Sequence, residues 1–197
     1  MGHIEKSLEV YEKLRANKYK ITVENGISFV LEFKKKRYHH LAGFQHLKDK
    51  PHLSTLVTDK TAFYNALSRQ NITEQEVISS QKFFLIKERF DFFEQLISIM
   101  DAGEGRIILD YDQTKVKDSE IKAKFMLYKR SGTPFKEEFC CFSLFIGYDD
   151  ITKEYYPATY IVEHSNKYTN DQTPHYCTIE IIRPPKKKKK KPAKKAK

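Results

Sequence analysis

The sequence predicts an α+β domain, in which N-terminal helices and a β-hairpin pack on a C-terminal antiparallel sheet of about four to five strands. Three observations predict this class. Apolar side chains at helical spacing dominate the first hundred residues, a hairpin pattern interrupts them, and five strand-like segments follow residue 105. Short turn-like sequences separate these five segments, which favours an antiparallel sheet over a βαβ arrangement.

A helix and the hairpin are the first two predicted elements. Residues 4–15 predict a helix, because apolar residues recur there at helical spacing with charged residues between them. These apolar residues are Ile4, Leu8, Tyr11 and Leu14. Residues 19–33 predict the hairpin, since apolar and polar residues alternate on both sides of an Asn25-Gly26 turn.

The segment RYHHLAGFQHL, residues 37–47, contains three of the seven histidines within eight residues. It predicts a short helix whose apolar residues face inward, and Pro51 interrupts it. The inward-facing residues are Leu41, Phe44 and Leu47. The histidines are therefore expected on the polar side of an amphipathic helix, next to a run of Lys and Arg.

Three more helices are predicted before residue 103. Thr58-Asp59 supplies a cap for the helix AFYNALSRQ, and Thr73 with Glu76 forms a capping box for EQEVISSQ. Residues 83–100 predict one long helix, because large apolar side chains fall on a single face. That face consists of Phe83, Ile86, Phe90, Phe93, Ile97 and Met100.

Five segments predict the strands of the sheet, and they cover residues 106–114, 121–130, 138–149, 155–165 and 175–183. Residues 1–185 are thus expected to form a single domain. Residues 186–197 contain nine lysines and no acidic residue, which predicts a disordered polylysine tail. Since the net charge of the whole chain is +10, the remaining residues carry only +1 (10 − 9).

Composition predicts a soluble protein of the cytoplasm. No apolar run approaches the ~20 residues of a membrane span, and the first 30 residues lack a signal-peptide core. The three cysteines include the adjacent pair Cys140-Cys141, which favours reduced thiols over a disulfide. No metal or cofactor is expected, because HExxH, paired CxxC and phosphate-binding glycine loops are missing from the sequence.

The sequence does contain the residue types that metal-independent RNA cleavage needs. That reaction needs a base, an acid and a cation beside the phosphate, and histidine suits either proton-transfer role. Lys36 and Arg37 precede the histidines, while Thr159 and His164 lie on a later strand. The alternative is ordinary structure: adjacent histidines on an exposed helix are more often solvated, and Tyr160 is expected to pack in the sheet before it stacks on a base.

A family resemblance rests on the order of these elements and on several motifs. The early motif consists of Tyr38, His39, His40, Leu41, Gly43, Phe44 and Leu47. The late motifs are Leu127-Tyr128-Lys129, Leu144-Phe145-Ile146, the run Tyr156-Pro157-Ala158-Thr159-Tyr160, and Tyr168. Over roughly residues 4–183, the sequence resembles phage-associated members of the barnase–EndoU–colicin–RelE-like (BECR) nuclease superfamily.

The resemblance implies an α+β fold and the activity of a metal-independent endoribonuclease of the phage, toxin or defence-effector type. By position, it implies that His40 is the principal acid or base and that His39 is an auxiliary or structural neighbour. Thr159 stands where relatives more often carry Ser, and this change keeps the hydroxyl group.

The sequence therefore predicts a cytoplasmic endoribonuclease that cleaves RNA by attack of the 2′-OH. The expected catalytic residues are His40, His39, Thr159 and His164, and those expected to bind phosphate or RNA are Arg37, Lys36, Lys129, Arg130 and Tyr160. RNA is the expected partner, a cognate antitoxin or host protein is a further one, and the lysine tail would contact nucleic acid nonspecifically. The alternative is a non-catalytic phage accessory or inhibitor protein that binds nucleic acid or a host protein through its basic surface and tail.

Overall fold

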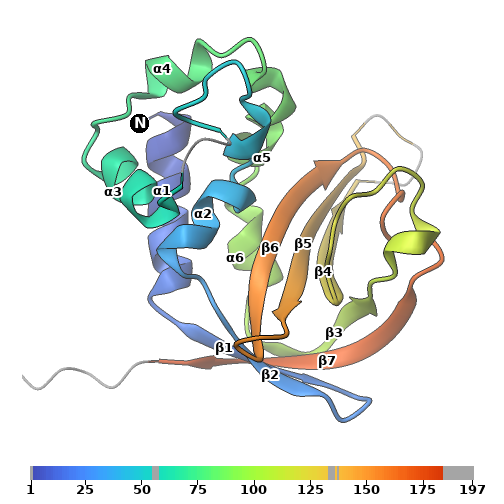
Figure 1. Cartoon of the computed structure of the whole chain (residues 1–197). Helices are drawn as coiled ribbons and strands as arrows, with labels where there is room; N and C mark the ends of the chain where they lie inside the picture. Colours follow the sequence, from blue (N-terminus) through green and yellow to red (C-terminus); the bar gives the residue numbers. More distant parts are fainter. Residues whose placement is uncertain (1, 55–57, 133–135, 137, 184–197) are drawn as a thin grey trace, which may run out of the picture.

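The computed structural model describes residues 2–54, 58–132, 136 and 138–183. Helices from the first half of the chain lie on one side of a single, strongly curved antiparallel sheet (Figure 1). The predicted α+β class is confirmed. None of the helices in the described residues is long and apolar enough to cross a membrane.

The helices mostly begin and end where the sequence predicts. They are α1 (His3–Arg15), α2 (Lys35–Leu41), η1 (Phe44–His46), α3 (Lys60–Ser68), α4 (Glu74–Ile78), η2 (Phe83–Leu85), α5 (Lys87–Asp91), α6 (Gln95–Ile99) and η3 (Gln113–Lys115). The predicted cap at Asp59 is confirmed, and the predicted capping box is confirmed in its Thr73 half, since the Glu76 carboxylate pairs with His52 instead. The Asp59 carboxylate accepts from the backbone N–H groups of Thr61 and Ala62, and the Thr73 hydroxyl accepts from that of Glu76.

The prediction of one long helix over residues 83–100 is wrong. The backbone leaves helical geometry at Ile86 (φ −123°) and at Phe92 (φ −113°), so η2, α5 and α6 form three short turns instead. These breaks keep Phe90 and Phe93 in the core but leave Ile97 37% exposed. Packing of the aromatic rings against the sheet has therefore overridden the local helical pattern.

The sheet has seven strands in the order β2-β1-β7-β3-β4-β5-β6. Their bounds are β1 (Lys18–Val23), β2 (Ser28–Glu32), β3 (Gly103–Asp110), β4 (Phe125–Ser131), β5 (Cys140–Asp149), β6 (Glu154–Glu163) and β7 (Thr173–Ile182). The five predicted C-terminal strands are all present. The hairpin β1–β2 does not pack on this sheet, however, because β1 pairs with β7 and extends it.

The sheet curves until its two edge strands nearly meet. Phe29 on β2 stacks on Tyr155 on β6 with ring centroids 4.1 Å apart, and the Lys34 ammonium donates to Glu154 over 2.8 Å. The curvature gives the sheet a face toward the helices and a face away from them, each with its own hydrophobic cluster. The helix-facing cluster contains the buried rings of Tyr11, Tyr38 and Tyr64. The predicted polylysine tail, residues 186–197, lies outside the described residues.

Candidate functional site

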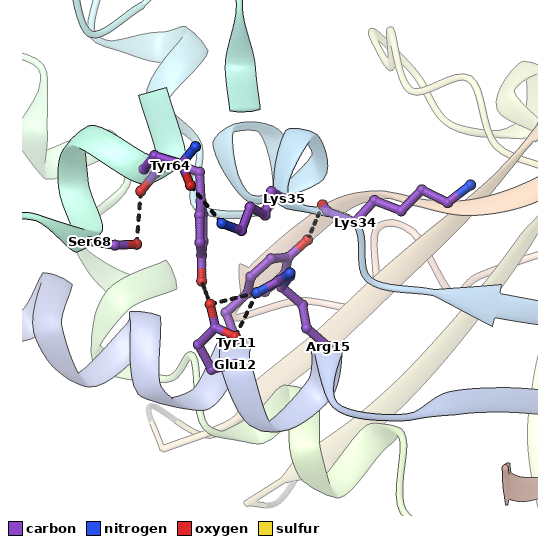
Figure 2. Close-up of polar contacts among 8 residues, drawn as sticks. Tyr11, Glu12, Arg15, Lys34, Lys35, Tyr64 and Ser68 are labelled. Carbon is purple, nitrogen blue, oxygen red and sulfur yellow. Dashed lines mark hydrogen bonds and ion pairs between the residues drawn. The ribbon is translucent and has the colours of Figure 1, made fainter. Parts of the chain in front are cut away.

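Helix α2 carries both adjacent histidines and is held between the other helices and the edge strand β6. Tyr38 and Leu41 are fully buried and anchor its inner face, as the amphipathic pattern predicts. A hydrogen bond from α1 holds the start of the helix, because the Tyr11 hydroxyl donates to the carbonyl of the N-cap residue Lys34 over 2.9 Å (Figure 2). The side chain of His40 extends from α2 to the first residue of α3.

His39 lies in the core. It is 2% exposed, its Nε2 is 3.0 Å from the carbonyl oxygen of Leu53, and its ring packs edge-on against Phe63. Because a carbonyl only accepts, Nε2 is the protonated nitrogen of this ring. Burial lowers the pKa of His39. These contacts place His39 as a structural neighbour of the site and do not favour the predicted proton-transfer role.

His40 is half-buried and is paired with a lysine that the sequence did not single out. The Nζ atom of Lys60, the first residue of α3, is 2.5 Å from Nε2 of His40. An ammonium only donates, so Nε2 accepts and the ring is neutral. Burial first, and then the charge of Lys60, lowers the pKa of His40 to about 4. At neutral pH His40 is therefore a base and not an acid.

Arg89 on α5 connects His40 to Thr159. Its Nη1 atom lies 3.4 Å from the carbonyl oxygen of His40 and 3.4 Å from Oγ1 of Thr159. Its Nη2 atom lies 3.4 Å from Nε2 of His46. The guanidinium thus contacts α2, η1 and β6. It meets Thr159 through the hydroxyl group and His40 through the backbone carbonyl, while the His40 imidazole faces Lys60.

The charge of Arg89 has no acidic partner in the part of the chain that the structure describes. Burial lowers the pKa of Arg89 to about 10, so it stays protonated at neutral pH. Among the residues that the structure describes, no carboxylate forms an ion pair with it, and its contacts of 3.4 Å are long for hydrogen bonds. Desolvation of a cation without an ion pair is costly, and a bound phosphate would compensate it with two parallel hydrogen bonds.

Gly43 makes room for this guanidinium. Its φ of +87° is in the left-handed region, and a Cβ atom built there would lie 2.7 Å from Cγ2 of Ile86 and 3.1 Å from Nη1 of Arg89. A side chain at position 43 would therefore collide with α5. Nothing in the sequence around Arg89 distinguishes it from an ordinary exposed charge on a helix. The glycine of the histidine motif, Gly43, is the one indirect indication, because it leaves the space that Arg89 occupies.

Arg37 and Lys36 lie on the same helix as His40. The guanidinium carbon of Arg37 is 3.6 Å from the ring centroid of Tyr156, and burial lowers the pKa of Arg37. Its charge is close enough to contribute to the lowered pKa of His40. Lys36 is exposed beside it. Both cations lie on the helix of His40, and their predicted role in binding phosphate stays a prediction.

Lys129 and Arg130 are neighbours on β4, so their side chains point to opposite faces of the sheet. Lys129 donates to Gln95 on the helix-facing side over 3.2 Å. Arg130 donates to Thr169 over 3.0 Å on the other face. Through the register that pairs Arg130 with Cys141 and Cys141 with Glu163, Arg130 shares its face with Thr159. Neither cation makes a contact with His40 or Arg89 in the described residues.

Tyr160 is a core residue. It is 0% exposed, and its hydroxyl donates to the carbonyl of Phe92 over 2.8 Å. Its ring therefore presents no face to a nucleobase, which corrects the prediction that it binds RNA.

His164 lies apart from His40. Its Nε2 is 2.9 Å from the Glu88 carboxylate, and this hydrogen bond raises the pKa of His164. Five residues separate it from Thr159, roughly 16 Å along an extended strand. The hydrogen bond to Glu88 and this separation do not favour the predicted second proton-transfer role of His164.

Within the described ranges, no three His, Cys, Asp or Glu side chains are placed to hold a metal ion. A family model described as phage-Barnase-EndoU-ColicinE5/D-RelE like nuclease4 matches residues 3–197, and it confirms the resemblance seen in the sequence. Comparisons with curated proteins and with solved structures find no match.

Proposed function

Since the chain belongs to the phage-Barnase-EndoU-ColicinE5/D-RelE like nuclease4 family, we propose that it is a metal-independent endoribonuclease whose site is built from His40, Lys60, Arg89 and Thr159. One observation carries the proposal: the Arg89 guanidinium, which is largely desolvated and has no carboxylate partner among the described residues, lies against Thr159 and the backbone carbonyl of His40, whose imidazole is neutral. This combination offers a phosphate-binding cation and a general base within one site.

The scissile phosphate binds to Arg89. Two guanidinium N–H groups would donate to its non-bridging oxygens, replacing the long contacts with the His40 carbonyl and with Thr159. The Thr159 hydroxyl then donates to the same phosphate and fixes its orientation. Arg37 and Lys36 border the site and bind flanking phosphates of the RNA backbone.

His40 starts the reaction as the base. The 2′-OH of the RNA takes the place of the Lys60 ammonium at Nε2 of His40 and loses its proton there. The 2′-oxygen attacks phosphorus and forms the O2′–P bond, while the P–O5′ bond breaks. Lys60, released from His40, donates a proton to the leaving 5′-oxygen. The products are a 2′,3′-cyclic phosphate and a 5′-hydroxyl end.

The contact between Lys60 and His40 also completes the proton cycle. After the reaction the histidine is protonated and the lysine is a neutral amine. Because the pKa of His40 is lowered to about 4, its proton passes to Lys60 when the two side chains meet again. The resting pair is then restored without a further residue.

A cleavage assay on a defined RNA in EDTA tests this proposal. We expect wild-type cleavage to persist in EDTA, to yield cyclic phosphate ends and to stop when the 2′-OH at the scissile position is absent. His40→Ala should lose about 100-fold or more in single-turnover rate. His52→Ala is the matched control, because His52 is an exposed histidine that pairs with Glu76 away from the site.

Two outcomes would contradict the proposal. One is cleavage that requires a divalent metal, and the other is an unchanged rate in His40→Ala. If no variant cleaves RNA but the protein binds it in a tail-dependent way, the chain is instead a binding protein with the fold of a nuclease.

A further inference from the structure

An apolar groove runs between α1 and the pair α3–α4, on the far side of α1 from the sheet. Its volume is about 700 Å³. Its apolar lining consists of Ile4, Leu8, Tyr64, Leu67 and Ile72. A groove of this size is large enough for several side chains of a peptide.

One rim of the groove is acidic. Glu5, Glu9 and Glu12 are spaced i, i+4 and i+7, so they form one stripe along α1, and Glu74 lies on the opposite rim. Glu12 is already used, because it accepts from the Tyr64 hydroxyl and pairs with Arg15 (Figure 2). The other two carboxylates of the stripe, Glu5 and Glu9, line the groove, and Glu74 accepts from the backbone N–H of His3 over 2.7 Å.

Glu5 and Glu9 have no cationic partner among the residues that the structure describes. Like charges at i, i+4 destabilise a helix. Lys13 is the one cation among the described residues lining the groove. The groove therefore offers apolar surface together with uncompensated negative charge, a combination that fits a basic peptide.

The chain itself contains such a peptide. Residues 186–197 (KKKKKKPAKKAK) carry nine lysines and no acid. The last described strand ends at Ile182, which pairs with Lys18, and Lys18 follows α1 by only three residues. The described part of the chain thus ends close to the C-terminal end of α1, and Glu12 is the residue of the acidic stripe nearest to that end.

The tail is long enough to follow the stripe. Arg15 and Glu5 are separated by about 15 Å along α1, at 1.5 Å per residue. The 14 residues that follow Arg183 span up to about 46 Å when extended. The tail is therefore long enough to dock along the whole groove.

We propose that residues 186–197 dock in this groove of their own chain. The alkyl stems of the lysines cover Leu8 and Ile72, and their ammonium groups meet Glu5, Glu9 and Glu74. Nucleic acid competes with the groove for the same lysines, so RNA binding releases the tail. This inference is independent of the proposed catalytic residues.

A zero-length carbodiimide cross-linker tests the proposal on the full chain, because it joins an amine only to a carboxylate in direct contact. The protein is treated at low concentration, and the linked peptides are identified by mass spectrometry. We expect links from the tail lysines to Glu5 and Glu9 to dominate. The double variant E5Q/E9Q should reduce the yield of tail links to the groove, Glu74 included, by roughly three- to tenfold.

The matched control is E104Q/E120Q, which removes two exposed carboxylates outside the groove. It should leave the tail links to the groove unchanged. Links spread evenly over Glu104, Glu120 and the groove would overturn the proposal. So would links found only in covalent dimers, because the groove would then hold the tail of a second copy.

Discussion

Lys60 donates to the side chain of His40 across 2.5 Å, although the two residues are 20 positions apart and belong to different helices. The lysine cannot accept a hydrogen bond, so this contact fixes the histidine in its neutral form with Nε2 as the acceptor. It also places a positive charge where a protonated imidazole would otherwise form. Burial lowers the pKa of His40 most, and the pair with Lys60 lowers it further, which extends to lower pH the range in which His40 works as a base.

The pH dependence of cleavage follows from this pair. His40 must be neutral to accept a proton, so kcat/KM should rise with pH through an inflection near the lowered His40 pKa of about 4. Lys60→Met removes one of the causes that lower this pKa. The inflection should then move to higher pH, toward about 6.5, and the maximal rate should fall. An inflection that stays in place in Lys60→Met would contradict the pairing, and Lys82→Met, which changes an exposed lysine, should leave the profile unaltered.

Arg89→Met should separate stability from activity. Removing a buried charge without a carboxylate partner is expected to raise the free energy of unfolding by about 1 kcal/mol, while cleavage is lost through weaker phosphate binding. Denaturant unfolding and single-turnover kinetics measure the two effects. Arg69→Met, at an exposed arginine, should change neither. A variant that is both less stable and fully active would show that Arg89 is structural.

Gly43→Ala should reduce cleavage more than its effect on stability explains. Alanine would have to adopt the left-handed φ of Gly43, and its methyl group would meet the side chains of Ile86 and Arg89 at 2.7 and 3.1 Å. Both side chains must then shift, which moves the guanidinium away from Thr159. Gly26→Ala provides a matched control, because Gly26 has a φ of +89° and a methyl group at that position would meet no atom within 4 Å. Both variants should lose about 1–2 kcal/mol to backbone strain. Equal activity in the two variants would remove the link between Gly43 and the site.

His164 is expected to matter for stability and not for cleavage. Its hydrogen bond to Glu88 raises its pKa in the folded protein, so the pair stabilises the fold fully below the unfolded value of about 6.5. This contribution disappears as the pH rises through the folded pKa. The stability difference between wild type and Glu88→Gln should accordingly be larger at acidic than at alkaline pH. His164→Asn should cleave RNA at the wild-type rate, and a large loss of rate would return His164 to the catalytic site.

Local patterns predicted most elements of the fold. Alternation around Asn25-Gly26, the caps at Asp59 and Thr73, and the inward residues of the RYHHL helix are all short-range signals, and each is confirmed. The pairing of β1 with β7 is different. It joins segments about 150 residues apart, and nothing in either segment specifies the partner (Figure 1).

The site was predictable only in part, for the same reason. His40 and Thr159 stand out by residue type, but Lys60 and Arg89 are single basic residues among 36 in the chain. Lys60 matters because it contacts the His40 ring, and Arg89 matters because it is desolvated with no carboxylate partner among the described residues. Both properties arise only in the folded molecule. Tyr160 shows the opposite error, since an aromatic residue in a basic protein is as easily a core residue as a surface for RNA.

The position of β7 between β1 and β3 has a consequence for biosynthesis. During translation, the hairpin β1–β2 leaves the ribosome long before its neighbour in the sheet exists, by roughly 8–30 s at 5–20 residues per second. Until then the nascent chain holds two separate sheet fragments with unpaired edges. The edge strand β6 and the helices around His40 cannot settle against a completed sheet before β7 is inserted. The cell that makes the protein is therefore exposed to the assembled site only after the codons of β7 have been read.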